Sequence, residues 1–294
     1  MPILQRLCEW MSATQFTGNW ANGSPLTVVP CLWNGATSIH SCGSSAAATR
    51  ASVSAVMSHR IILTHIPRTG GTSLFSALKA QQPQVKAVEF GSTSEVALMK
   101  DSELNSYTLI SSYVGSKLFD RLDDSWTKII ILRDPVARLR SSYWNLRTNP
   151  TYISGASSMA KAKGFDDYLA SRDPAVTLQA TNVQTWTVLG DKSIFYRQKH
   201  AKVDEGRITA MAIECLEDYD FVGFTETLDE FWAGLCQQFG WKVIRLPKLR
   251  VNSPFAMDED AAAIDLEYHT HLDRRLIQVA KNMPETSSSL VRLR

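Results

Sequence analysis

A short apolar strand that runs into a Gly-Gly turn and then a helix is the feature that most constrains the fold of this chain. Residues 61–63 are Ile-Ile-Leu, and Gly70 and Gly71 follow a few residues later. Leu74 and Leu78 then recur at helical spacing. A strand, a glycine-bearing turn and a helix in this order form the opening unit of a nucleotide-binding α/β sheet.

The turn itself, residues 65–73 (His-Ile-Pro-Arg-Thr-Gly-Gly-Thr-Ser), is suited to binding an anion. Glycines let the backbone approach a ligand closely, and the free N–H groups at a helix start attract negative charge. Arg68 adds a full positive charge. The other candidate ligand-binding residues offer backbone N–H groups or hydroxyls: Thr69, Gly70, Gly71, Thr72 and Ser73. The alternative is an ordinary strand-to-helix turn, in which the glycines and Thr72 or Ser73 only cap the helix.

The turn lacks the lysine of a Walker A loop. That loop requires Gly-x-x-x-x-Gly-Lys followed by Ser or Thr, because the lysine reaches the terminal phosphates. Here Gly71 is followed directly by Thr72. A P-loop kinase or NTPase is therefore disfavoured.

A second cluster of anion-binding residues follows another predicted strand. Residues 129–132 are apolar on both faces, as a central parallel strand should be, and Arg133 stands at the carboxyl end, where α/β folds place ligands. Arg138 and Ser141 are three residues apart on the helix that follows Pro135. We expect Arg133 with Ser141 to hold a terminal phosphate. A solvated basic helix is the alternative, and it is the favoured interpretation for Arg138 taken singly.

The remaining pattern predicts an α/β fold with a central parallel β-sheet flanked by helices, a P-loop NTPase-like three-layer sandwich. Further strands are expected at residues 107–111 and 219–224, and further helices at 165–169, 182–189, 227–239 and 257–281. The last helix is expected to bury a face made of Tyr268, Leu272, Leu276 and Val279.

The first 57 residues differ in composition from the rest of the chain. They are rich in small and polar residues and contain a low-complexity run at residues 44–49. We predict a disordered N-terminal extension over residues 1–57 and one folded domain over residues 58–294. A start codon assigned too early, with Met57 as the true start, is an equally good explanation.

Composition excludes several functional classes. The net charge of +2 argues against a nucleic-acid or membrane-surface binder. Five cysteines without a CxxC pair give no metal-site spacing, and an odd number suits a reducing compartment. Because no apolar run approaches the roughly 18 residues of a transmembrane helix, we expect a cytoplasmic protein without a membrane span.

Two anion sites at two strand ends imply a ligand with phosphate groups at both ends. The two segments resemble motifs of the sulfotransferases that use 3′-phosphoadenosine 5′-phosphosulfate (PAPS), especially the carbohydrate type. The matching residues of the first motif are His65, Ile66, Pro67, Thr69, Gly70, Gly71, Thr72 and Ser73, and those of the second are Arg133, Asp134, Pro135, Arg138, Ser141 and Tyr143. Weaker similar segments extend the resemblance over about residues 58–283.

The resemblance implies PAPS as co-substrate, no metal, and a hydroxyl on a carbohydrate, lipid or small metabolite as acceptor. The first loop would bind the 5′-phosphosulfate, and Arg133 with Ser141 the 3′-phosphate. A loop around Lys248 and Arg250 would fold over the nucleotide, although it is equally well read as ordinary surface. Oligomeric state is not readable from the sequence.

The chain departs from the family pattern at two places. Arg68 replaces the usual lysine, which neutralises the leaving phosphate oxygen; arginine keeps the charge but cannot donate a proton. The histidine that commonly serves as base is missing, and Ser111-Ser112-Tyr113 stands there. Tyr113 has an ordinary pKa of about 10, which makes it a poor base at neutral pH. The other candidates for the base are Glu89, Glu95, Asp101 and His65. A catalytically weakened nucleotide-binding relative is therefore the alternative function.

Overall fold

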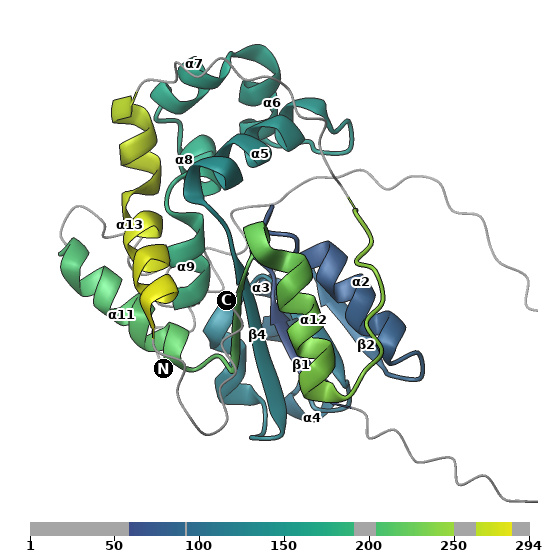
Figure 1. Cartoon of the computed structure of the whole chain (residues 1–294). Coiled ribbons are helices and arrows are strands. Elements are labelled where there is room, and N and C mark those ends of the chain that lie inside the picture. Colours follow the sequence, from purple (N-terminus) through teal and green to yellow (C-terminus); the bar gives the residue numbers. More distant parts are fainter. Residues whose placement is uncertain (1–58, 92, 191–203, 250–262, 284–294) are drawn as a thin grey trace, which may run out of the picture. The chain divides into compact units, whose positions relative to one another are not determined.

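The computed structural model describes residues 59–91, 93–190, 204–249 and 263–283, and a five-stranded sheet lies at its centre (Figure 1). The strands are β1 (Arg60–Thr64), β2 (Ala87–Phe90), β3 (Leu109–Ser112), β4 (Trp126–Leu132) and β5 (Phe221–Phe224). Their order is β2-β3-β1-β4-β5, and every pairing is parallel. The predicted α/β class is confirmed.

The sheet is buried on both faces, as the continuous apolar strands predicted. Ile61 and Leu63 contribute to one core cluster and Ile62 to the other, because side chains alternate along a strand. Helices α2 (Gly71–Gln81) and α12 (Leu228–Phe239) cover the first face. The second face is covered by η1 (Gly115–Arg121), α9 (Val183–Leu189), α11 (Glu205–Glu217) and α13 (Ala263–Asn282).

A group of helices between β4 and α9 has a core of its own. It comprises α5 (Pro135–Thr148), α6 (Gly155–Ala162), α7 (Phe165–Ala170) and α8 (Pro174–Ala180). Leu139, Tyr143 and Tyr168 lie in this core. Helix α5 begins as predicted with Pro135 in its first turn, and the Asp134 carboxylate caps it by accepting a hydrogen bond from Ala137 N.

Two local predictions are wrong. Neither Thr72 nor Ser73 caps α2: the helix begins at Gly71, its N-cap is Gly70, and no side chain makes the cap. On α13, Leu272 and Leu276 are buried as expected, but Tyr268 is exposed. The buried face of α13 instead includes Asp273, a polar residue that an apolar stripe does not predict.

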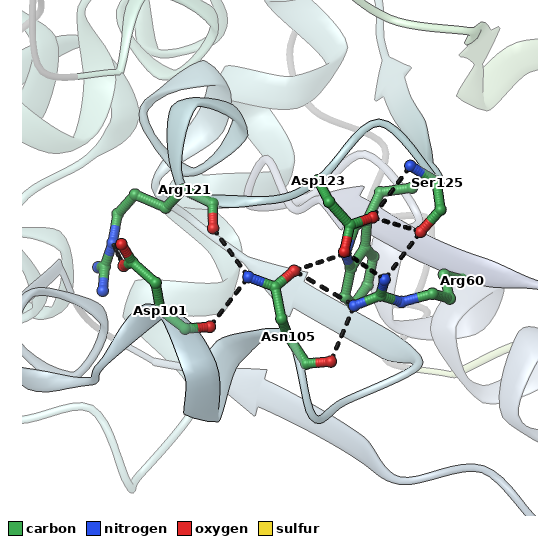
Figure 2. A network of polar contacts seen from close by, with 7 residues as sticks. Arg60, Asp101, Asn105, Arg121, Asp123 and Ser125 are labelled. Atoms are coloured by element: carbon green, nitrogen blue, oxygen red, sulfur yellow. Dashed lines mark hydrogen bonds and ion pairs between the residues drawn. The ribbon is translucent and has the colours of Figure 1, made fainter.

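The short elements α3 (Thr93–Leu98), α4 (Asp101–Leu104) and η3 (Thr225–Thr227) complete the described part. Figure 2 shows a polar network at the amino ends of the strands, in which Asn105 lies between Arg60 and Arg121. Arg60 also forms an ion pair of 2.6 Å with Asp123. Because all strands are parallel, their amino ends lie at one edge of the sheet and their carboxyl ends at the other. This network stabilises the edge with the amino ends.

No helix of the described ranges combines the length and the apolar character that crossing a bilayer requires. The predicted extension over residues 1–57 falls outside the residues that the structure describes.

Candidate functional site

The loop between β1 and α2 has a backbone that only a few residues can adopt. Arg68 has a φ of 72° and Gly70 a φ of 90°, both in the left-handed region. The buried hydroxyl of Thr69 donates to Ile66 O at 2.9 Å. Thr225, which follows β5, donates its hydroxyl to Thr69 O at 2.7 Å. The loop is therefore held by hydrogen bonds from the Thr69 hydroxyl, within the loop, and from the Thr225 hydroxyl, which follows β5.

Gly71 is required by packing rather than by conformation. A Cβ at this position would lie 2.6 Å from Cδ2 of His65, closer than real Cβ contacts. His65 itself is buried at the end of β1. The predicted turn thus brings the first peptide of α2 directly against an imidazole ring.

Arg133 reaches this loop from the end of β4. Its Nη1 donates to Arg68 O at 2.8 Å, and its buried Nε has no hydrogen-bond partner among the described residues. Burial lowers the pKa of Arg133, while Glu226 and Asp134 act in the opposite direction. An arginine remains charged under these conditions, so the site holds a positive charge with unused hydrogen-bonding capacity.

Ser141, on α5, lies next to the same loop. The Arg68 Nε donates to Ser141 Oγ at 3.0 Å, and Arg68 Nη1 to Asn145 Oδ1 at 3.4 Å. Arg68, Arg133 and Ser141, predicted from separate segments, are brought together. The two anion-binding clusters therefore adjoin each other at the carboxyl ends of β1 and β4.

Arg138 does not lie on a solvated face, and that expectation was wrong. Its side chain is buried, its Nη2 donates to Ala180 O at 3.1 Å, and its Nε and Nη1 have no partner within the described ranges. Burial lowers the pKa of Arg138, while the Asp273 carboxylate raises it and Arg133 lowers it further. A second guanidinium therefore adds to the positive charge behind Arg133.

Three of the candidate bases lie together at the ends of β1, β2 and β3. His65 Nδ1 is 3.4 Å from Glu89 Oε1 and 3.4 Å from Ser111 Oγ. The rings of His65 and Tyr113 are stacked, with centroids 4.7 Å apart. Glu89 is the most exposed member, with 41% of its side-chain surface accessible. A carboxylate and a phenol thus contact the imidazole ring that packs against Gly71.

The other two candidate bases lie at opposite ends of the sheet, Asp101 near the amino ends of the strands and Glu95 beside Gly91 at the carboxyl end of β2. Asp101 forms an ion pair of 2.7 Å with Arg121 in the network at the amino ends of the strands (Figure 2). Glu95 accepts a hydrogen bond from Gly91 N at 3.0 Å. Because Asp101 lies at the opposite end of the sheet, we exclude it as a base for this site.

The predicted covering loop is described only in part. Lys248 is exposed, and the adjacent Leu249 N donates to Ser73 Oγ at 3.3 Å, so this segment reaches the first turn of α2. Arg250 lies outside the described residues.

Sequence reasoning assigned no role to Gln184, which contacts Arg133 through two hydrogen bonds. It lies in a segment similar to a weak family motif, residues 182–185, and that was the available signal. Asp134 N donates to Glu226 at 2.8 Å, and this carboxylate was likewise not singled out.

In the described ranges no cluster of three or more His, Cys, Asp or Glu residues is arranged to hold a metal ion.

A model of the Sulfotransferase family matches residues 56–283, which includes the whole site. No curated protein matches the chain.

Proposed function

This chain belongs to the sulfotransferase family, and we propose that it transfers a sulfuryl group from PAPS to a hydroxyl of a carbohydrate, lipid or small metabolite. The observation that carries the proposal is the contact of 3.0 Å between Arg68 Nε and Ser141 Oγ. This contact brings the loop before α2 next to the second predicted anion-binding cluster, so the two lie close enough for one nucleotide to reach both.

The residues present fit such a donor. The orphaned Nε of Arg133, backed by the buried Arg138, is a ready partner for the 3′-phosphate, with Ser141 beside it. The N–H groups of Gly71 and Thr72 at the start of α2 would hold the 5′-phosphate end. When bound, the donor supplies the activated sulfuryl group, and no metal is needed in this proposal.

Arg68 is the residue that we assign to charge stabilisation. As charge develops on the leaving phosphate oxygen, a guanidinium nearby stabilises it electrostatically without giving up a proton. Arg68 has a positive φ, and its side chain contacts Ser141 on α5. To reach the 5′ end of the donor, the Arg68 guanidinium would have to give up its hydrogen bond to Ser141.

We propose Glu89 as the base that removes the proton of the acceptor hydroxyl. Carboxylates in general ionise well below neutral pH and phenols well above it, so a glutamate is the better base. The His65 ring, stacked on Tyr113 and 3.4 Å from Glu89, would orient the carboxylate. Tyr113 stays a candidate for direct contact with the acceptor.

A nucleotide-binding protein without transfer activity is the second candidate. It is favoured by the position of Arg68, whose Nε and Nη1 contact Ser141 and Asn145 on α5. In that function the guanidinium would serve binding only.

Two measurements test these functions in sequence. We expect adenosine 3′,5′-bisphosphate to raise the melting temperature of the full chain, and ATP with magnesium to have little effect. A shift with ATP and magnesium alone would remove both candidates. If the bisphosphate binds, transfer of radiolabelled sulfate from PAPS into a mixed acceptor extract identifies the enzyme, and its absence identifies the binding protein.

A further inference from the structure

Arg133 is held at both polar atoms of its backbone by one buried carboxamide. Gln184 Oε1 accepts a hydrogen bond from Arg133 N at 2.9 Å, and Gln184 Nε2 donates to Arg133 O at 2.8 Å. Gln184 is 0% exposed. Arg133 follows the last residue of β4, where the sheet no longer fixes the backbone. The carboxamide therefore sets the direction in which the Arg133 side chain leaves the strand.

Gln184 is itself anchored by the C-terminal helix α13. Asp273, on α13, accepts hydrogen bonds from Gln184 N at 3.2 Å, from Thr185 N at 2.8 Å and from Thr185 Oγ1 at 2.8 Å. Asp273 is 1% exposed and also interacts electrostatically with Arg138. A buried carboxylate is stable only with such partners, so the first turn of α9 and α13 must stay in register.

Asn182, which precedes α9, also forms hydrogen bonds with α13. Its N–H donates to His269 O at 2.8 Å, and its Oδ1 accepts from Leu272 N at 3.0 Å. Both are backbone groups in the middle of α13, and Asn182 adopts the left-handed conformation with a φ of 47°. The start of α9 thus has little freedom to move relative to α13.

We propose that Gln184 is a positioning residue for the nucleotide, acting through Arg133 on the 3′-phosphate, and that Asp273 on α13 holds Gln184 in place. The inference rests on the proposed function, because the phosphate-binding role of Arg133 is part of it. The physical reason is geometric: a phosphate is recognised by a guanidinium fork only in a narrow range of orientations. A rotation of the Arg133 peptide would turn the fork away from its ligand.

The test compares two ligands that differ by the 3′-phosphate. In the variant Gln184→Met, which removes both hydrogen bonds at similar volume, we expect the Kd for adenosine 3′,5′-bisphosphate to rise about tenfold. The Kd for adenosine 5′-monophosphate, which lacks the 3′-phosphate, should not change. An equal loss for both ligands, or no loss for either, would overturn the proposal.

Gln82→Met is the matched control. Gln82 is also a buried glutamine, and it accepts a hydrogen bond from a backbone N–H, that of His59, at 2.8 Å. It lies at the C-terminal end of α2, whereas the candidate site lies at the N-terminal end of this helix. We expect Gln82→Met to leave both Kd values unchanged. If Gln184→Met does not fold, Gln184→Glu keeps the shape of the side chain and loses the donor to Arg133 O. It should show the same selective loss, and equal affinity of Gln184→Glu and the natural chain for the bisphosphate would overturn the proposal.

A double-mutant cycle separates positioning from an independent contact. If Gln184 acts through Arg133, then Gln184→Met should cause no further loss of bisphosphate affinity in an Arg133→Ala background. Additive losses would contradict the inference. The proposed function can be tested separately from this inference. If the natural chain does not bind the bisphosphate, both the proposed function and the inference are wrong. If the natural chain binds it and Gln184→Met binds it equally well, only the inference is wrong.

Discussion

The guanidinium of Arg68 donates from its Nε to the hydroxyl of Ser141 at 3.0 Å, although the two residues belong to different predicted anion sites. The loop before α2 and the second turn of α5 are therefore immediate neighbours. In the proposed function, one ligand that carries phosphates at two ends contacts both. Arg68 is also the residue at which the chain departs from the lysine of the family pattern, so its substitution is informative.

Removing the charge of Arg68 should impair transfer more than binding. In Arg68→Met we expect kcat for sulfate transfer to fall about 100-fold, because the developing charge loses its stabilising cation. Arg68→Lys, which restores the charge as a single ammonium, should retain most of the activity. Steady-state kinetics with PAPS as donor measure both. A fully active Arg68→Met would contradict the assignment.

Arg133→Ala should weaken adenosine 3′,5′-bisphosphate about 10- to 100-fold, because a charge-assisted fork to the 3′-phosphate is lost. Isothermal titration calorimetry gives the affinity directly. Tyr113→Phe should bind the bisphosphate as the natural chain does. Tyr113 follows β3 and its ring packs on His65, and phenylalanine keeps this ring contact. Equal affinities of Arg133→Ala and the natural chain would show that the 3′-phosphate assignment is wrong.

Glu89→Gln should reduce kcat about 100-fold through loss of the general base. The Kd of the variant for the bisphosphate should stay the same. A Glu89→Gln variant with the kcat of the natural chain would assign the base to another residue.

The network at the amino ends of the strands should make a small contribution to acid stability, because Asp123 is exposed and solvent screens its interactions. Hydrogen bonds from Ser125 and Arg60 hold the pKa of Asp123 at about 2, below its ordinary value of 3.8. Because the folded chain favours the ionised form, this contribution is present above the ordinary pKa and is lost as the pH falls through about 2.

Urea unfolding at several pH values measures that contribution. Asp123→Asn should lower the unfolding midpoint at neutral pH and reduce its decline between about pH 4 and pH 2. Ser125→Ala, which removes the strongest cause of the shift, should lie between this variant and the natural chain. Identical acid profiles for all three chains would refute the role of the network.

The sequence predicted those parts of the site that depend on local pattern and on sheet topology. Arg68 and Arg133 follow two apolar strands, and parallel strands bring their carboxyl ends to one edge of a sheet. The strand ends therefore predicted two anion sites that one ligand could span, but not the direct contact of Arg133 with Arg68 O. Gly71 was predicted as part of the glycine turn, whereas the structure shows that packing against His65 requires a glycine there.

The environment of Arg138 could not be predicted in the same way. On α5 its position resembles a solvated basic face, but its side chain is buried, donates to Ala180 O and interacts electrostatically with Asp273 of the distant helix α13. Gln184 carries no local signature either, since a glutamine in a short helix is common in any fold. Such residues are fixed by tertiary packing, and only the folded structure brings their partners together.

The central claim is that one nucleotide is held at both of its phosphate ends, and calorimetry with three ligands tests it most directly. Adenosine 3′,5′-bisphosphate should bind the natural chain at least about tenfold more tightly than either adenosine 5′-monophosphate or adenosine 3′-monophosphate, because each monophosphate leaves one set of charged partners unused. Equal affinity for the bisphosphate and one monophosphate would contradict the account, since one of the two anion sites would then contribute nothing.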